Sequence, residues 1–147
     1  MVKNPARVLG FTIIELVFVI AMIGIFAVAI IVLINPIKRI NQARDSKVKS
    51  DISQIATGLQ NYFVLNSLFP TSPETTLVTS GDLRTYPIPP EGGSYIYSRS
   101  NVCVAGACEA SIYGTLKDPS ISGSGNVWCW RSATGKMIEL SLSSCTP

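Results

Sequence analysis

The stretch LGFTIIEL, residues 9–16, opens an apolar run that continues through residues 11–34, and this run decides the architecture of the chain. After Thr12 the run is interrupted only by Glu15 and Gly24. As a helix it would be about 36 Å long, which exceeds the hydrocarbon core of a bilayer. We therefore predict a helix that spans a membrane.

The single carboxylate inside this run calls for a partner. At the centre of a bilayer a carboxylate costs about 2.5–3.5 kcal/mol, so such residues persist where they find a counter-charge or serve a function. Lys3 and Arg7 precede Glu15 and are one source of positive charge. A second source is the α-amino group that cleavage after Gly10 would create on Phe11. In a third interpretation, Glu15 lies near the headgroups and caps free N–H groups in the first turn of its own helix.

The basic leader that ends in Gly10, followed by FTIIEL and a long apolar helix, resembles the class III signal of type IV prepilins and type II secretion pseudopilins. In that family a membrane aspartyl peptidase cleaves after the glycine and methylates the new N-terminal residue. The resemblance implies cleavage between Gly10 and Phe11, N-methylation of Phe11 and an assembly role for Glu15. It covers the first third of the chain. Family helices often contain a proline within the run, whereas here the first proline after the junction is Pro36.

The leader, residues 1–10, is too short and polar to contain the apolar core of a secretory signal, so processing would leave the membrane helix on the mature protein. The positive-inside rule keeps the leader in the cytoplasm, but basic residues beyond the run oppose that orientation. The family resemblance implies that the C-terminal domain is extracytoplasmic. The opposing residues are Lys38, Arg39, Arg44, Lys47 and Lys49. We interpret them as a solvated helix face near lipid headgroups, with DNA binding along an assembled fibre as the alternative.

Composition and length restrict the function further. Of 147 residues, those outside the leader and the membrane helix suffice for one small domain. Beyond Lys3 and Arg7 the chain carries ten basic and nine acidic side chains, which gives no general attraction to nucleic acid. The chain has no histidine, which excludes histidine-dependent nucleophiles and histidine-ligated metals. We expect no catalytic residue, no cofactor and no metal site.

Asn35 and Pro36 predict a break or kink after the apolar run, because the residue before a proline avoids the α region and proline lacks an N–H donor. An amphipathic helix is then predicted over residues 37–65 within the globular domain 35–147. Its apolar stripe comprises Val48, Ile52, Ile55, Leu59 and Tyr62, broadened by Ala56 and Phe63. The polar side chains Lys47, Lys49, Asp51, Gln54, Gln60 and Asn61 lie outside this stripe. We expect the stripe to form the core of the domain.

Residues 66–93 are rich in Pro, Gly, Ser and Thr and are predicted to be a surface loop without helix. A β-sheet is predicted over residues 94–142, followed by a C-terminal tail. Its four strands are expected at 94–99, 107–116, 127–131 and 136–142, most simply as an antiparallel meander. The fold class is therefore α+β and pilin-like, a long N-terminal helix packed on a small antiparallel sheet. Trp128 and Trp130 share one face of the third strand, which favours sheet packing over a ligand cage.

The four cysteines are Cys103, Cys108, Cys129 and Cys145, all in the predicted extracytoplasmic part. An even count in that compartment indicates two disulfides, with free buried thiols or a zinc site as alternatives; no C-x2-C pair is present to favour zinc. Three pairings are possible. We select Cys103–Cys108, which would close the first hairpin, and Cys129–Cys145, which would bound a C-terminal loop as in many pilins. The alternative joins Cys108 to Cys129 and Cys103 to Cys145.

Two functions of different classes fit these features. The first is a structural subunit, stored as a single-pass protein of the bacterial inner (cytoplasmic) membrane, that polymerises through its helix into a type IV pilus filament. In it Glu15 would pair with the N-terminus of a neighbour. Close variants are a pseudopilin of a periplasmic type II secretion pseudopilus and a subunit of a competence pilus. Expected partners are further copies of the chain, the prepilin peptidase, the assembly platform and minor pilins.

The second function is a membrane-anchored extracytoplasmic binding domain that never assembles. A mere anchor needs neither a junction between Gly10 and Phe11 nor a carboxylate such as Glu15 within the span. These features favour the filament subunit.

Overall fold

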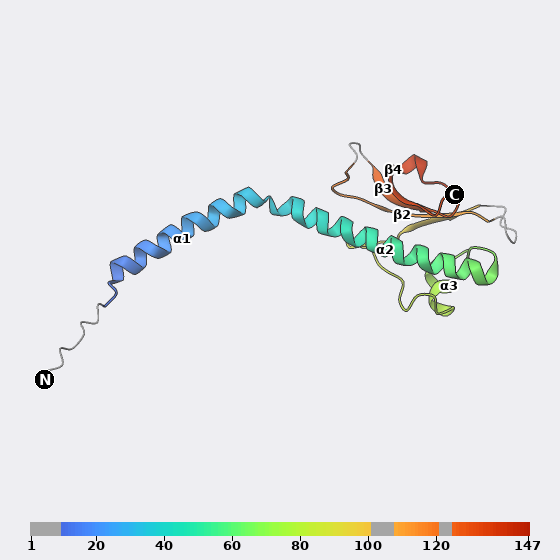
Figure 1. The fold of residues 1–147 in the computed structure, drawn as a ribbon, viewed down its shortest axis with the longest axis horizontal. Coiled ribbons are helices and arrows are strands. Elements are labelled where there is room, and N and C mark those ends of the chain that lie inside the picture. Colours follow the sequence, from blue (N-terminus) through green and yellow to red (C-terminus); the bar gives the residue numbers. More distant parts are fainter. Residues whose placement is uncertain (1–9, 101–107, 121–124) are drawn as a thin grey trace, which may run out of the picture. The chain divides into compact units, whose positions relative to one another are not determined.

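The structure, a computed structural model, describes residues 10–100, 108–120 and 125–147. It divides into two units, Met1–Arg39 and Ile40–Pro147. Within the described ranges the chain forms three α-helices, a four-stranded antiparallel sheet and a short 3-10 helix (Figure 1). The fold is α+β with a long apolar N-terminal helix, as predicted.

Helix α1, Ile13–Ile34, is the helix that the apolar run predicts. None of its 22 residues is buried, and among the described helices it alone is long and apolar enough to cross a membrane. It begins two residues later than the predicted span 11–34, because Thr12 is its N-cap, with φ −86° and ψ 149°. Phe11 and Thr12 are therefore outside the helix.

The predicted break falls at Asn35. This residue adopts the left-handed conformation, with φ 48° and ψ 76°, which asparagine tolerates better than most residues. Helix α2, Pro36–Asn66, starts at the next residue, one residue before the predicted 37–65. Asn35 also caps α2, because its Oδ1 accepts from the N–H of Lys38 and its carbonyl accepts from the N–H of Arg39, both at 3.4 Å.

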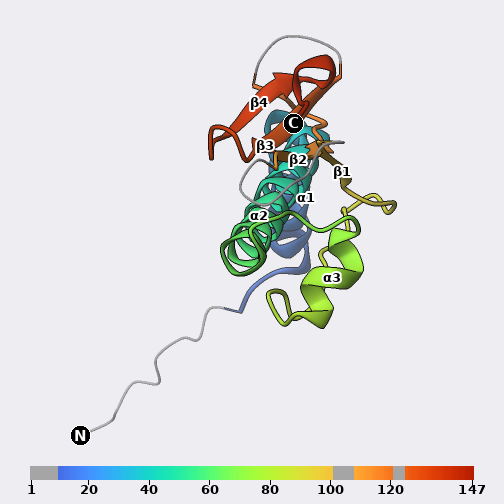
Figure 2. The same ribbon diagram turned by 90° about the vertical axis from the view of Figure 1, so that its right-hand side faces the viewer.

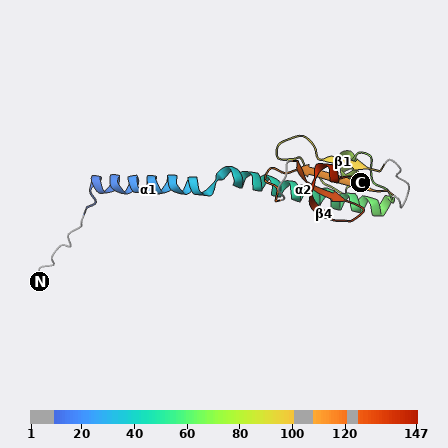
Figure 3. The ribbon, with the colours of Figure 1, turned by 90° about the horizontal axis from the view of Figure 1, so that it is seen from above.

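The sheet of the second unit is the predicted meander, with strand order β1-β2-β3-β4 and every pair antiparallel. Figures 1 and 3 show it lying along the C-terminal part of α2. The strands are β1 (Ile96–Arg99), β2 (Ala110–Thr115), β3 (Asn126–Arg131) and β4 (Met137–Ser141), followed by the 3-10 helix η1 (Leu142–Ser144). Each strand lies within or one residue from its predicted range. The expected turn at 103–108 falls mostly outside the described residues.

The core lies between α2 and one face of the sheet. Ile52, Ile55 and Leu59 of the predicted stripe are fully buried, and Val48 is nearly so. They meet a cross-strand row on the sheet that consists of Tyr97, Ile112, Trp130 and Met137. The stripe is thus the core of this unit, and the two tryptophans pack within the sheet as predicted.

Gly114 shows how closely α2 approaches β2. A Cβ atom built there would lie 2.7 Å from Cγ1 of Val48 and 2.9 Å from Cε1 of Tyr95. Such distances leave no room for any side chain, so glycine in the interior of this strand marks a close approach of two elements.

The prediction that residues 66–93 contain no helix is wrong. Helix α3, Pro73–Thr79, lies within this range, on the β1 side of α2 (Figure 2). Pro73 occupies its first turn, where the missing N–H is no loss, and Glu74 complements the positive end of the helix. Leu77 is fully buried in the core and anchors the short helix to the unit. Pro73 was interpreted as a residue that prevents helix formation, but it is the first residue of α3.

Asp51, which the sequence placed outside the apolar stripe, is nevertheless buried. It is 5% exposed, and its Oδ2 accepts from the Tyr95 hydroxyl at 2.6 Å and pairs with Lys47 Nζ at 2.7 Å. Burial, together with the hydrogen bond to Asp51, raises the pKa of Tyr95 well above its usual value. Asp45 is equally buried and accepts from the N–H groups of Lys117 and Asp118 at 2.8 and 2.7 Å. Through these hydrogen bonds Asp51 joins Tyr95 to α2, and Asp45 joins the segment that starts at Lys117 to α2.

The outer face of the sheet carries a small second core. Val127, Cys129 and Cys145 are buried there, with Tyr113 and Leu140 packed against them. The disulfide Cys129–Cys145 joins β3 to the C-terminal tail, which confirms that predicted bridge and excludes a bond between Cys129 and Cys108. The other predicted bridge involves Cys103, which lies outside the described residues.

Substituting Cys145 by Ser should lower the free energy of unfolding by up to about 3 kcal/mol, since the bridge closes a loop of 16 residues in sequence separation. Chemical denaturation of the full chain under non-reducing conditions measures the change. Wild-type protein with a reductant should lose at least as much stability, because the reductant also opens the second bridge, whereas Ser144→Ala, beside the Cys129–Cys145 bridge, should not lose it. An unchanged unfolding midpoint in Cys145→Ser would show that the tail adds nothing to stability.

Candidate functional site

The junction between Gly10 and Phe11 lies in non-helical backbone directly before α1. Both residues are exposed, with Phe11 at 71%. A Cβ atom at Gly10 would meet nothing within 4 Å. A non-helical and exposed peptide bond of this kind is open to a peptidase, and packing places no demand on glycine at position 10.

Thr12 fixes the start of the helix just after this junction. Its Oγ1 accepts from the N–H of Glu15 at 3.4 Å, and its carbonyl accepts from the N–H of Leu16 at 3.2 Å. Thr12 and Glu15 have the spacing of a capping box, Thr-x-x-Glu before an apolar run. This signal was present in the sequence, and the sequence analysis missed it.

Glu15 is exposed in the first turn of α1, where a negative charge interacts favourably with the helix dipole. The structure therefore places the carboxylate at the N-terminal end of the apolar helix, four residues after Phe11. Lys3 and Arg7, the other candidate partners, lie outside the described residues.

Apart from Glu15 in the first turn, the lateral surface of α1 is apolar. Ile13, Ile14 and Leu33 are each about four-fifths exposed, at 84, 79 and 83%. Gly24 interrupts the surface and has nothing within 4 Å of a Cβ position. A helix of this kind needs lipid or other apolar helices around it, since no side of it is buried.

The basic cluster beyond α1 is partly engaged within the protein. Arg44 pairs with Glu91 at 2.9 Å, Lys47 pairs with Asp51, and Lys49 Nζ lies 4.7 Å from the centroid of the Trp128 ring. These contacts account for three of its five cations. DNA binding along this helix stays a prediction.

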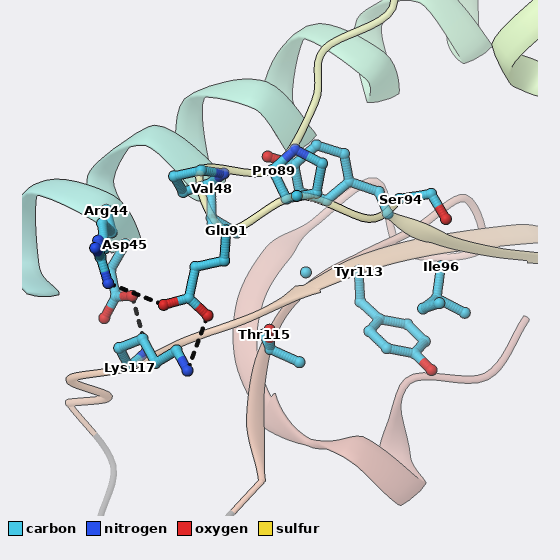
Figure 4. A pocket seen from close by; sticks show the side chains of 14 residues that line it. Arg44, Asp45, Val48, Pro89, Glu91, Ser94, Ile96, Tyr113, Thr115 and Lys117 are labelled. Atoms are coloured by element: carbon cyan, nitrogen blue, oxygen red, sulfur yellow. Dashed lines mark hydrogen bonds and ion pairs between the residues drawn. The ribbon is translucent and has the colours of Figure 1, made fainter.

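A second cluster surrounds Glu91 in the loop before β1 (Figure 4). Its two carboxylate oxygens pair with different cations, Oε1 with Arg44 at 2.9 Å and Oε2 with Lys117 at 2.8 Å. The hydrogen bond from Lys117 and the charges of Lys117 and Arg44 hold the pKa of Glu91 below its usual value. The adjoining cavity is about 210 Å³. Since both oxygens of Glu91 are engaged, the cluster fastens the loop to α2 and to Lys117.

Metal binding finds no support in the described residues, where no three His, Cys, Asp or Glu side chains come together in a group that could hold an ion. The candidate site residues therefore fall into two separate groups. Gly10, Phe11 and Glu15 lie together at the start of α1, and Cys129 and Cys145 lie in the second unit.

Comparisons with family models, with curated proteins and with solved structures found no match to this chain.

Proposed function

We propose that this protein is a structural subunit of a type IV pilus filament that polymerises through α1. The observation that carries the proposal is the start of α1, where an exposed Gly10–Phe11 bond precedes a capped apolar helix with Glu15 in its first turn. An anchor alone requires only the apolar helix. The exposed junction and the carboxylate are accounted for when the chain is both processed and assembled.

In this proposal the subunit is stored in the bacterial inner membrane with its leader in the cytoplasm and the second unit outside. The prepilin peptidase removes the leader, and the assembly platform, together with minor pilins, moves subunits into the filament. α1 leaves lipid and packs against the helices of other copies. Its apolar and fully exposed surface suits both surroundings.

Protein extracted from membranes should lack residues 1–10 and carry one methyl group on the α-nitrogen of Phe11. Intact-mass analysis and N-terminal peptide sequencing measure both changes. Gly10→Val should block them, because the peptidase of the family that the leader resembles cleaves after glycine. A Cβ atom at position 10 would meet nothing within 4 Å and the position is exposed before α1, so the variant tests processing without disturbing the fold.

The control for this experiment is Gly24→Ala, another glycine with nothing within 4 Å of a Cβ position, which should be processed normally. Mature filaments that retain Met1 to Gly10 would refute the proposal.

A further inference from the structure

The segment 87–94, which we call the strap, runs between two tyrosines that hold its ends. Tyr86 precedes it, and the hydroxyl oxygen of Tyr86 is buried. Tyr95 follows it, is 4% exposed and donates its hydroxyl to Asp51 at 2.6 Å. Every residue of the strap is exposed or half-buried, and Ile88 is 66% exposed. Burial therefore fixes the ends of the strap and contributes little to holding its middle.

The middle of the strap is joined to other elements through one side chain. Glu91 pairs through Oε1 with Arg44 of α2 at 2.9 Å and through Oε2 with Lys117, which follows β2, at 2.8 Å (Figure 4). In the part of the chain that the structure describes, no other residue of the strap has a hydrogen bond or ion pair to another element. The three side chains are 41–49% exposed, and ion pairs at such exposure are weak and are screened by salt.

The backbone around Glu91 consists of a rigid turn followed by a hinge. The N–H of Gly92 donates to the carbonyl of Pro89 at 3.0 Å, and Pro90 restricts φ within this turn. Gly92 and Gly93 have φ values of 81° and 85°, which glycine adopts without strain, and a Cβ atom at either would meet nothing within 4 Å. The turn that carries Glu91 can thus move as a unit about the two glycines.

The strap lies over an apolar edge of the core. The cavity of about 210 Å³ beside Glu91 is lined by Val48 and Tyr95 from the core and by Pro89 and Pro90 from the strap. Val48 and Tyr95 are each only 4% exposed. We propose that the strap is a cover operated by charge, which stays closed over this edge while Glu91 is ionised and paired, and which opens when that charge is neutralised or screened.

Acid should open the strap, with a sign set by Glu91. The hydrogen bond from Lys117, with the charges of Lys117 and Arg44, holds the pKa of Glu91 below its usual value. Closure is therefore complete at neutral pH and is lost as the pH falls through the pKa of Glu91. Asp45 and Asp118 are the other carboxyl groups on the segments that face Glu91, so acid alone does not isolate its effect. A variant at neutral pH does.

The test is NMR relaxation of the full chain, which carries isotope-labelled glycine and is held in micelles of a neutral detergent. In the wild type at neutral pH and low salt, the amides of Gly92 and Gly93 should have order parameters of about 0.85, the value of rigid backbone. In Glu91→Gln at the same pH they should fall below about 0.6, the range of flexible backbone. Wild-type protein at about 1 M salt, where the screening length is about 3 Å, should show the same loss.

The internal reference is Gly135, another glycine with positive φ, which lies between β3 and β4 and should stay ordered in every sample. The matched control is Glu74→Gln, which removes an exposed carboxylate from α3 and should leave the order of Gly92 and Gly93 unchanged.

The proposal is overturned if Gly92 and Gly93 are as ordered in Glu91→Gln as in the wild type, or if they are already flexible in the wild type at neutral pH. A wild type that stays ordered at high salt would contradict it as well. So would a loss of order at Gly135 in Glu91→Gln, since the charge would then support the whole unit. The strap lies entirely in the second unit, so none of these results depends on whether the chain is processed or polymerises.

Discussion

Cells that carry Glu15→Val should lose surface filaments while their subunits still insert into the membrane and are cleaved. Electron microscopy of the cells measures the filaments, and immunoblotting of membranes measures the processed subunit. The bond between Gly10 and Phe11, where we propose cleavage, is exposed and lies before the helix, so a change at Glu15 leaves its surroundings intact. Loss of filaments with normal processing would assign Glu15 to assembly.

The physical reason is the charge at the new N-terminus. After cleavage Phe11 carries an ammonium group that methylation leaves charged, and an unpaired charge within an apolar layer costs about 2.5–3.5 kcal/mol. When helices are staggered, Glu15 of one subunit can pair with Phe11 of the next, and only the correct register gives this pair. Because about 1.4 kcal/mol corresponds to a tenfold change in an equilibrium, the loss of Glu15 should reduce filaments at least tenfold.

The competing interpretation, in which Glu15 only stabilises its own helix, predicts a much smaller effect. Thr12 already caps the N–H of Glu15, and the dipole interaction of an exposed carboxylate is worth about 0.3–1 kcal/mol. Glu15→Gln separates the two interpretations, since it keeps the size of the side chain and removes the charge. We expect Glu15→Gln to lose filaments like Glu15→Val, with partial recovery when wild-type subunits are present.

The neighbouring change Ile14→Val is the control, because it alters an exposed apolar residue of the same helix turn without altering charge. Normal fibres on Glu15→Val cells would contradict the charge pair and leave assembly to helix packing alone. Loss of long fibres on deletion of the gene would separate a pilus from a short periplasmic pseudopilus.

Local patterns predicted most of this fold. The apolar run specified α1, the 3.6-residue stripe specified the buried face of α2, and strand and turn signals specified the meander. Each of these depends on residues that lie close together in the sequence. The break at Asn35 was predicted for the same reason, since the following Pro36 restricts it directly.

The features that the sequence analysis missed depend on contacts between distant segments. The burial of Asp51 was not predicted, because its own helix cannot reveal that Tyr95 reaches it from 44 residues away. Leu77 stabilises α3 by packing into a core that is formed from other elements, so the short helix could not be predicted from its own residues. At the start of α1 the position of Glu15 was predicted from the sequence. The capping of the Glu15 N–H by Thr12 was not predicted, although the Thr-x-x-Glu spacing that signals it was present.

Trp130→Ala should destabilise the second unit by about 3–5 kcal/mol, the usual cost of removing a large buried aromatic residue. Its side chain is fully buried between Ile112 and Met137 in the cross-strand row, and its ring meets Phe69 edge to face, with 6.1 Å between centroids. Stabilities of whole domains are about 5–15 kcal/mol, so the variant would lose a large part of the total.

The matched control for this change is Trp128→Ala, two residues away on the same face. Trp128 is only partly buried, and Lys49 lies over its ring. Trp128→Ala therefore loses partial burial and one cation–π contact, and it should reduce the free energy of unfolding by less than half as much as Trp130→Ala.

Trp130→Phe provides a second comparison, because it keeps an aromatic ring while removing an indole N–H that has no partner in the described part of the chain. It should therefore retain most of the stability that Trp130→Ala loses. Chemical denaturation followed by circular dichroism gives all three values. If Trp128→Ala proved as damaging as Trp130→Ala, the core would extend to the Lys49 side of the sheet instead of centring on the row through Trp130.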